Sequence, residues 1–363
     1  MAVKSKERVD KYIYQNLLAL EDGGRLPGVR AIMRDCGVSQ LTVQSILKKY
    51  EELKLIQASD RRGFFKVGDI NDKFNYEELD LVYCPHAKQE DPMMQFHGSL
   101  SHSIGKYCGK HWRSVRMHFM EDKVDFADFK RIAGSSKCRA CILVSPSTPE
   151  IGEIFRQNHV AYVNLFSNSL ELDKYAPNLV IDNDHLVESQ LRHLIELGHK
   201  KIGYMHLKRP NEAIRDLQMR LKLFLELTQK YGIVAEPEWI QFGGYDSDTT
   251  TKAMGRILDG GKRPTALICN DHHLPGVYNS LYSRSLTPGK DFSVVGTDNM
   301  SISQILSPQA TTVDTSAEWA ARKALTMLEK SMKDLDYNET INIECELIIR
   351  ESTGKNPLKG EVK

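Results

Sequence analysis

In the first seventy residues, apolar side chains recur at steps of three and four, which is the spacing of an amphipathic helix. The first helix spans about 5–20, and its apolar face is formed by Val9, Tyr12, Ile13, Leu17 and Leu20. A short helix over 29–36 follows, and Ser39 is a good N-cap for a third helix over about 40–54. Two short apolar runs then flank a polar turn that contains Arg61 and Arg62. This order predicts a winged helix-turn-helix.

From Leu79 onward, apolar runs of strand length alternate with segments of helical periodicity. The strand-like runs read LDLVYC, VRMHF, ACILVS, VAYVNLF, LVID, KIGYMH, WIQF, TALIC, FSVVG and TTV. This alternation predicts an α/β fold with parallel sheets covered by helices on both faces. Roughly 280 residues are too many for one compact sheet, so we predict two lobes, with 151–166 and 179–205 as the passage between them. The predicted parts are a winged helix-turn-helix head over 1–68, a polar linker over 69–78 and a two-lobed domain over 79–363.

The composition is that of a soluble globular protein, with 41% hydrophobic and 27% charged residues in a chain of 363. No apolar run approaches the roughly 18 residues that span a bilayer, and the first residues lack the apolar stretch of a secretory signal. We therefore expect a cytoplasmic protein with no membrane partner. The seven scattered cysteines are expected to be reduced and mostly buried. Cys138 and Cys141 have the spacing of a metal or redox pair, but no second pair follows at zinc spacing, so we expect no metal or cofactor.

Charge is distributed unevenly along a chain whose net charge is only +1. Residues 1–68 contain thirteen Lys and Arg against eight Asp and Glu, so the rest of the chain is acidic overall. A basic end on an acidic body is expected where one module contacts phosphate groups and the remainder does not. Double-stranded DNA is therefore the expected partner of the head.

The second helix of a helix-turn-helix pair enters the major groove, so its N-terminal outward positions carry side chains that bond to base edges. These positions hold Gln40, Leu41, Gln44, Ser45 and Lys48. Arg61 and Arg62 at the tip of the wing can reach a neighbouring groove or the backbone, and Arg30 adds positive charge. The alternatives are a winged helix that contacts proteins, and a small domain whose basic residues are merely solvated.

The segment GGRLPGVRAIMRDCGVSQLTVQSILKKYEELKLIQASDRRGFFKV resembles the DNA-binding domain of the gluconate-repressor (GntR) family over its whole length. The matching positions are Leu26-Pro27, Arg30, Gly37-Val38-Ser39, Thr42-Val43, Gly63 and Phe65. The resemblance implies DNA contacts by Arg30, Ser39 and Thr42. Gln40 and Gln44 stand where that family usually has DNA-contacting arginines. Glutamine pairs with adenine and arginine with guanine, so the operator is expected to differ from the family's usual one.

Polar residues that follow strand-like runs are candidate ligand contacts, because open α/β sheets bind ligands beyond the carboxyl ends of their strands. Asn270 follows TALIC, and Asp298 follows SVVGT. Tyr245 follows WIQFGG, and His185 ends the DNDH run after LVI. Asp and Asn after a strand also commonly cap the next helix, which is the alternative for each position taken singly.

The stretches IDNDHLVESQLRHLIELGHKKIGYM, PTALICNDHHLPGVYNSL, DFSVVGTDNMSISQILSPQATTVD and ELIIREST resemble the effector-binding core of the lactose/galactose-repressor (LacI/GalR) family. The resemblance implies a periplasmic-binding-protein-like fold that dimerises and binds a small effector between its lobes. It implies that Asp298 hydrogen-bonds a sugar or base ligand and that Asn270 is a polar contact. Tyr245 would offer its ring to an apolar face of the ligand, and His185 would be a contact from the first lobe.

One position departs from the family's pattern. The effector-binding arginine of that family corresponds, in this comparison, to Gln218, two residues before Arg220-Leu221. Arg215 lies one turn earlier on the same predicted helix and is a possible substitute. The departure favours a neutral sugar over an anionic effector.

We therefore predict a sequence-specific transcriptional regulator, a repressor, that forms a homodimer and responds to a small-molecule effector, expected to be a sugar. The combination resembles the arabinose-repressor type, with a GntR-like head on a LacI-like core. The alternatives are an enzyme fused to a winged-helix head and a sugar receptor with no DNA role. The chain lacks the Gly-x-Ser-x-Gly, GxxxxGK and HExxH motifs, and the adjacent His272 and His273 make poor joint metal ligands. The basic head and the missing secretory signal oppose the receptor.

Overall fold

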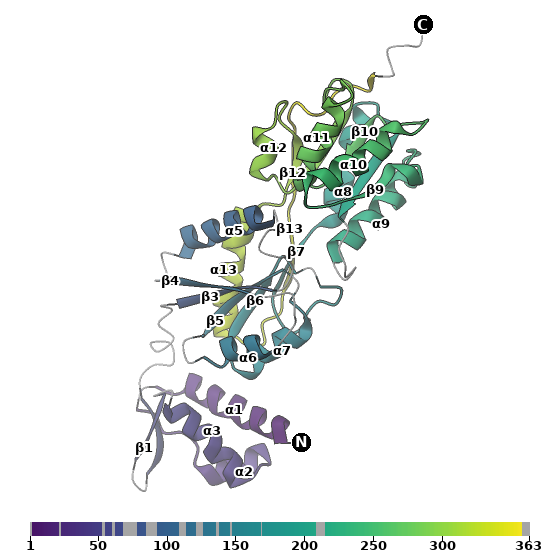
Figure 1. The fold of residues 1–363 in the computed structure, drawn as a ribbon. Coiled ribbons are helices and arrows are strands. Elements are labelled where there is room, and N and C mark those ends of the chain that lie inside the picture. The colour runs from purple at the N-terminus through teal and green to yellow at the C-terminus, as the bar shows by residue number, and fades with distance from the viewer. Residues whose placement is uncertain are drawn as a thin grey trace.

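The computed structural model describes residues 2–21, 23–52, 55–59, 62–67, 78–84, 93–108, 114–120, 126–135, 138–145, 147–167, 169–207 and 215–357. Figure 1 shows three bodies: a head with the N-terminus, a first lobe in the middle and a second lobe toward the C-terminus. They hold one two-stranded sheet and two six-stranded sheets. Residues 69–77 of the predicted linker lie outside the described residues, and Glu78, which the sequence assigned to the linker, begins β3 instead.

The head consists of three helices followed by an antiparallel hairpin. Its elements are α1 (Ala2–Ala19), α2 (Val29–Cys36), α3 (Gln40–Glu52), β1 (Ile56–Ser59) and β2 (Gly63–Lys66). The predicted apolar faces meet in one buried cluster that includes Val9, Ile13 and Val43. Gly37 ends α2 in the left-handed region with φ 62°, and the Ser39 hydroxyl accepts the Thr42 N–H at 3.4 Å. The tight turn between α2 and α3 therefore has the cap that the sequence predicted.

The first lobe is built on an all-parallel sheet of order β13-β7-β6-β5-β3-β4. Its strands are β3 (Glu78–Tyr83), β4 (Ser114–Phe119), β5 (Ala140–Val144), β6 (Ala161–Leu165), β7 (Asn178–Ile181) and β13 (Thr340–Ile343). Its helices are α5 (Met93–Cys108), α6 (Phe126–Ala133), α7 (Pro149–Gln157) and α13 (Ala317–Lys333). Along β3, Leu79 and Leu81 pack with α5 and α13, whereas Val82 packs with α6 and α7. Strand side chains alternate between faces, so this sheet is covered on both.

The second lobe has the strand order β14-β12-β11-β10-β8-β9, with only β14 antiparallel to its neighbour among the described strands. The strands are β8 (Ile202–Leu207), β9 (Ile240–Gly243), β10 (Ala266–Ile268), β11 (Ser293–Thr297), β12 (Thr311–Asp314) and β14 (Glu346–Ile348). The helices are α8 (Asn183–Glu196), α9 (Arg215–Lys230), α10 (Ser247–Asp259), α11 (Leu274–Tyr282) and α12 (Ser301–Ile305), with short 3-10 turns η1 (Pro237–Trp239) and η2 (Asp271–His273). Helices α8 and α9 pack together, as do α10 and α11, and the two apolar clusters that they join confirm the predicted cover on both faces.

The chain crosses between the lobes three times, from β7 to α8, from β12 to α13 and from β13 to β14. Since β7, β12 and β13 all end at a crossing and run parallel to their sheets, the carboxyl ends of both sheets face the junction. The predicted passage over 179–205 contains the first crossing. The predicted passage over 151–166 is wrong, because α7 and β6 both belong to the first lobe. Strand–helix alternation looks the same within a lobe as between lobes.

All seven cysteines are buried free thiols, as predicted from their surroundings in the sequence. Burial raises the pKa of the Cys141 thiol well above its ordinary value, and that of Cys138 is raised by burial and by the nearby Asp80 carboxylate. Both side chains are thus protonated and unreactive. Among the described residues, none of the helices combines the length and the apolar character that a bilayer crossing requires.

Candidate functional site

The carboxyl ends of neighbouring strands in the second lobe bring together polar residues that the sequence singled out. Asn270 lies two residues beyond β10, and Asp298 directly follows β11. The Asn270 side chain hydrogen-bonds the Asp298 carboxylate. The Asp298 backbone is left-handed, with φ 93°, and its N–H donates to the Val313 carbonyl at 2.8 Å. This backbone conformation, which is rare for a residue with a side chain, fixes the carboxylate at the junction between the lobes.

A buried guanidinium, that of Arg220 on α9, faces the Asp298 carboxylate. Arg220 is 5% exposed, and its Nε donates to Asn183 Oδ1 at 2.8 Å. Asn183 in turn donates to Asp216 Oδ1 at 2.8 Å. Burial lowers the pKa of Arg220, but Asp216 and Asp298 outweigh it and hold the pKa above its ordinary value. One permanent positive charge is therefore shared between two carboxylates.

Burial has the opposite effect on the two carboxylates. It raises the pKa of Asp216 and of Asp298 above the ordinary aspartate value, although Arg220 pulls both down. The network is thus stable as a charged group only while the guanidinium is present. At the junction end of the network, half-buried Asp298 and buried Asn270 carry hydrogen-bond acceptors and donors that a ligand could use.

The sequence analysis named Gln218 and Arg215 on α9, whereas the buried cation of this helix is Arg220. Gln218 is exposed on α9, and Arg215 lies on its first turn with Nη1 3.9 Å from an Asp216 carboxylate oxygen. The buried stripe of α9 consists of Asp216, Arg220, Phe224 and Thr228. These residues are spaced by four, so the sequence did carry a signal for Arg220: two charged residues on a helix face that is buried.

Aromatic rings lie beside the polar network at the same strand ends. The rings of Tyr245 and His272 are 5.1 Å apart, and those of His206 and Phe242 are 5.5 Å apart. The Nε2 atoms of His272 and His273 are 3.0 Å apart, so one of them donates and the other accepts. Burial, with His272 and His206 nearby, lowers the pKa of His273 well below its ordinary value. His273 is therefore uncharged at neutral pH within this aromatic wall.

Two aspartates that follow strands have the structural role that was the alternative for each such position. Asp182 Oδ1 accepts the N–H of His185 at 3.0 Å and caps α8. Asp271 is fully buried and accepts the Thr312 hydroxyl at 2.8 Å and the Met300 N–H at 2.7 Å. The His185 side chain is exposed, and no hydrogen bond among the described residues brings it to the Asn270–Asp298 pair.

The first lobe contributes serines that the sequence analysis missed. Ser145 and Ser147 follow β5, and Ser167 and Ser169 follow β6, all at the carboxyl ends that face the junction. The Ser169 hydroxyl donates to the Ser147 carbonyl at 2.8 Å. The hydroxyls of Ser147 and Ser167 are buried and have no hydrogen-bond partner within the described part of the chain. Unpaired buried hydroxyls at a strand end are available to a polar ligand.

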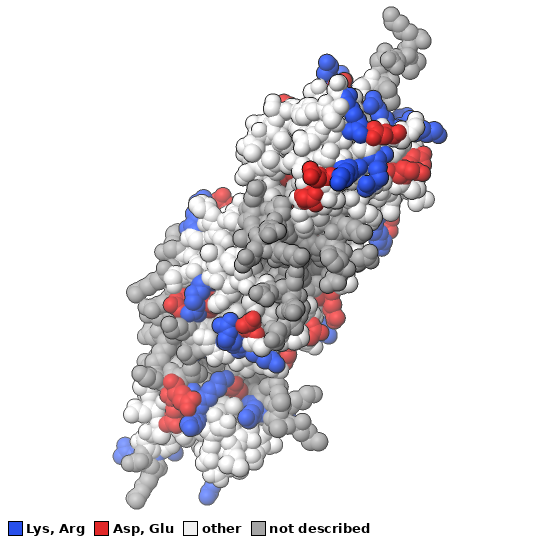
Figure 2. Space-filling view, viewed as in Figure 1, with Lys and Arg blue, Asp and Glu red and all other residues white. Residues whose placement is uncertain are grey.

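In the head, α3 has a buried apolar face and an exposed polar face. Val43, Ile46, Leu47 and Tyr50 are buried, whereas Gln40, Gln44 and Lys48 are exposed. Arg30 and Arg62 are exposed, Thr42 is half-buried beside the capping Ser39, and Arg61 lies outside the described residues. Figure 2 shows Lys and Arg mixed with Asp and Glu on the upper part of the head and scattered basic side chains at its outer end. The basic surplus is thus dispersed over the face in view.

Comparisons with known proteins concern mainly the two-lobed part. Residues 191–353 match the family model described as a periplasmic binding protein-like domain. Over 166 residues the chain is 31% identical to the HTH-type transcriptional repressor PurR of Mannheimia succiniciproducens, which covers 45% of this chain and 49% of that protein. Over 196 residues it is 30% identical to the HTH-type transcriptional repressor CytR of Escherichia coli K12, which covers 53% and 55%. The chain thus contains a periplasmic binding protein-like domain and is similar in sequence to these two repressors.

Solved structures agree on the fold of the two-lobed part. A LacI transcriptional regulator from a Rhodococcus species has a TM-score of 0.63 and 20% identity, over 77% of this chain and 99% of that chain. A LacI family regulator from Enterococcus faecium, with bound ribose, has a TM-score of 0.63 and 17% identity, over 76% and 99%. At these identities the likeness concerns the fold alone. The chain spans about half the length of the two repressors that it matches in sequence.

Proposed function

We propose that this protein is a DNA-binding transcriptional repressor whose activity depends on a small neutral effector bound between the two lobes of the core. The observation that carries the proposal is the union, in one chain, of a LacI-type core with a head whose third helix has an exposed polar face. The sequence relatives named above are repressors and not enzymes, which supports the sign of regulation and a binding role for the core.

The chemistry at the junction favours a polyhydroxylated, uncharged effector such as a sugar. Asp298 and Asn270 supply acceptors and donors for hydroxyl groups, and Tyr245 supplies a ring for the apolar face of such a molecule. The charge of Arg220 is already balanced by Asp216 and Asp298, so this guanidinium is not free to bind an anion.

The head is proposed to be a winged helix-turn-helix of the GntR type. Three helices, a glycine turn and a hairpin occur in the expected order, which supports this assignment. In this proposal Gln40, Gln44 and Lys48 meet the major groove, Arg30, Ser39 and Thr42 contact the DNA beside it, and Arg61 and Arg62 belong to the wing.

A homodimer would place two heads on two operator half-sites. An apolar patch on the second lobe supports this part of the proposal, because Tyr282 of α11 is 45% exposed and Ile305 of the adjoining α12 is 75% exposed. Ile305→Glu should convert a dimer into a monomer in sedimentation velocity. Leu225→Glu, on the opposite face of the same lobe, is the matched control and should leave the dimer intact. Equal behaviour of the two variants would remove this patch from the interface.

The effector is tested by thermal denaturation of the full chain against a panel of sugars and related metabolites. At least one uncharged polyhydroxylated compound should raise the melting temperature, and Asp298→Asn should abolish that shift. Asp248→Asn, an exposed aspartate on α10, should leave it unchanged. A shift that survives in Asp298→Asn would contradict the site.

DNA binding is tested by selecting sequences from a random duplex pool with the full chain. Gln40→Ala and Gln44→Ala should each weaken binding to the selected operator about tenfold or more, since a bidentate base contact contributes about 1–3 kcal/mol of discrimination. Gln229→Ala, an exposed glutamine of the second lobe, is the control. Enrichment of no sequence above background would rule out the proposed role of the head.

A further inference from the structure

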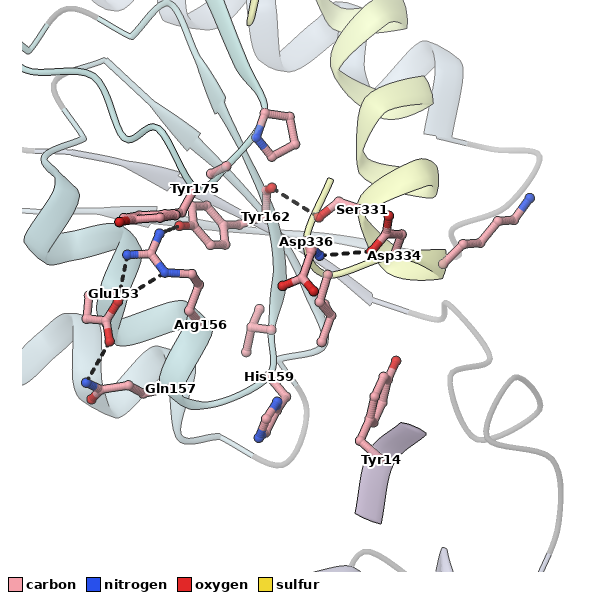
Figure 3. A pocket seen from close by; sticks show the side chains of 15 residues that line it. Tyr14, Glu153, Arg156, Gln157, His159, Tyr162, Tyr175, Ser331, Asp334 and Asp336 are labelled. Atoms are coloured by element: carbon pink, nitrogen blue, oxygen red, sulfur yellow. Dashed lines mark hydrogen bonds and ion pairs between the residues drawn. The ribbon is translucent and has the colours of Figure 1, made fainter. Parts of the chain in front are cut away.

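A cavity of about 310 Å³ lies between the head and the first lobe. It is separate from the junction between the lobes, and neither Asn270 nor Asp298 lines it. Figure 3 shows Tyr14 of α1 on one side of it and residues of the first lobe on the others. The lobe contributes Val160 and Pro177, which lie just before β6 and β7. The cavity therefore lies at the amino ends of these strands, whereas the effector junction lies at their carboxyl ends.

The contact that forms this cavity is held together by specific polar interactions. Asp10 of α1 is buried, and Lys49 of α3 reaches its Oδ2 at 3.0 Å. His159, from the turn after α7, hydrogen-bonds the same oxygen, and the Tyr14 ring stacks on His159 at 6.1 Å between centroids. Burial raises the pKa of Asp10, but His159 and Lys49 outweigh it and hold the pKa below its ordinary value. The head thus rests on the first lobe through an ionised aspartate.

One wall of the cavity is a preformed cation site that is already filled by a side chain. Arg156 Nη1 lies 2.7 Å from Asp173, and Nη2 lies 2.7 Å from Glu153. The guanidinium also lies over the Tyr175 ring, 5.2 Å from its centroid, and donates to the Tyr162 hydroxyl at 2.5 Å. A Cβ on Gly152 would lie 1.9 Å from an Asp173 oxygen, so only a glycine at this position allows Asp173 to pack against α7. Carboxylates and tyrosine faces together accept a planar cation here.

The remaining walls of the cavity also combine carboxylates with aromatic rings, and no arginine lines them. Asp334 and Asp336 line the cavity after α13, and Figure 3 shows Asp336 between Asp334 and the Tyr162 ring. Asp334 Oδ1 accepts the Asp336 N–H at 3.0 Å, which fixes the loop. Tyr14, Tyr162 and His159 supply the rings. Among the charges that line the cavity, Glu153 is paired with Arg156, which leaves two carboxylates, Asp334 and Asp336, against one cationic side chain, Lys333.

We propose that this cavity binds a small organic cation, an aliphatic amine or guanidinium compound, whose charge lies near Asp334 and Asp336 and whose carbon chain lies against the tyrosines. The volume is at the lower end of ligand pockets, roughly 300–1,000 Å³, so the ligand is small. A ligand in contact with both Tyr14 and the first lobe stabilises the docked position of the head. The binding part of the proposal does not depend on the head's binding of DNA, whereas its effect on DNA affinity rests on the proposed function.

Calorimetry on the full chain without DNA tests the site, with agmatine, putrescine and tetramethylammonium as probes at constant ionic strength. Succinate and butane-1,4-diol are the anionic and neutral controls of similar length. At least one cation should bind with a dissociation constant below about 1 mM, and neither control should bind. Asp336→Asn and Tyr14→Ala should each weaken that affinity about tenfold. Asp298→Asn, in the second lobe at the junction between the lobes, should leave it unchanged.

Three results would overturn the proposal: no heat from any cation up to about 10 mM, wild-type affinity in both Asp336→Asn and Tyr14→Ala, or loss of cation binding in Asp298→Asn. Circular dichroism of each variant shows that it is folded, and Lys6→Ala, an exposed residue near the start of α1, controls for general effects on the head. A cation that binds wild type and changes operator affinity only when Tyr14 is present extends the proposal to regulation. Loss of operator binding alone would leave the calorimetric result standing.

Discussion

Replacing Arg220 by methionine removes the one guanidinium shared between Asp216 and Asp298 while keeping an unbranched side chain of similar length in α9. Arg220 is 5% exposed, so solvent screens its interactions little. Removing one partner of a buried ionic group costs about 3–5 kcal/mol, because the remaining charge stays buried without compensation. We expect Arg220→Met to lower the free energy of unfolding of the second lobe by about 3 kcal/mol at pH 7.

The deficit should depend on pH in a direction that follows from the two aspartates. Burial already raises the pKa of Asp216 and Asp298 in the folded protein, and loss of Arg220 raises both further. An aspartate whose pKa is raised on folding destabilises the folded state as the pH rises from the unfolded value of 3.8 through the folded one. The variant should therefore lose more stability at pH 8 than at pH 5.

Urea unfolding followed by tryptophan fluorescence measures this difference, since one of the three tryptophans, Trp239, is buried in the second lobe. Arg192→Met is the matched control, since Arg192 forms an exposed ion pair with Glu188 on the neighbouring α8 and should contribute less than about 1 kcal/mol. Asp216→Asn added to Arg220→Met should recover part of the loss. If Arg220→Met cost no more than Arg192→Met, or if its cost were the same at pH 5 and pH 8, the shared-charge account would be wrong.

Three further predictions concern packing, pH and DNA. Gly296→Ala should lower the melting temperature by about 5 °C or more, because the new Cβ would lie 2.0 Å from Asp271 Oδ1. Gly261→Ala is the control and should have almost no effect, since no atom lies within 4 Å of its Cβ. Equal shifts in the two variants would contradict the close packing at Gly296. Wild-type stability should fall as the pH drops below 6.5, because buried His273 has its pKa held well below that value and stays neutral while the unfolded chain takes up a proton. His273→Asn should reduce that slope by up to about 1.4 kcal/mol per pH unit and exposed His185→Asn should not, so an unchanged slope in His273→Asn would refute the assignment. Arg62→Ala should reduce the slope of log affinity against log salt by about one in fluorescence anisotropy with operator DNA, and an unchanged slope would remove Arg62 from the phosphate contacts.

The elements of this protein could be predicted from the sequence wherever their signal is local. The helix over 29–36 was predicted to the residue, and the Ser39 cap lies where its type and position predict it. Both signals depend on neighbours within four residues along the chain. The strands from β3 to β12 were found for the same reason, since a short apolar run between turns needs no knowledge of its partner, whereas β13 and β14 were missed.

The arrangement of these elements depends on contacts between distant residues, and the sequence alone did not predict it. The last long helix, α13, returns to the first lobe and packs against α5, more than two hundred residues earlier in the chain. The contact between Asp10 and His159 likewise joins residues 149 positions apart. Neither pairing leaves a periodic trace, because each depends on how the chain passes between the lobes.

The polar residues at the junction between the lobes were predicted only in part, for a reason that concerns helix geometry. Asp298 and Asn270 follow strands, and the end of a parallel strand faces the ligand whatever the exact register of its neighbours. A residue on a helix has no such tolerance, because each position turns the side chain by about 100°. The two positions between Gln218 and Arg220 therefore amount to about 200°, which separates an exposed side chain from a buried one. Asp216, Arg220 and Phe224 are spaced by four residues, so they lie on the same buried face of α9. This spacing, and not the distance from the preceding strand, shows that Arg220 is the buried cation of the helix.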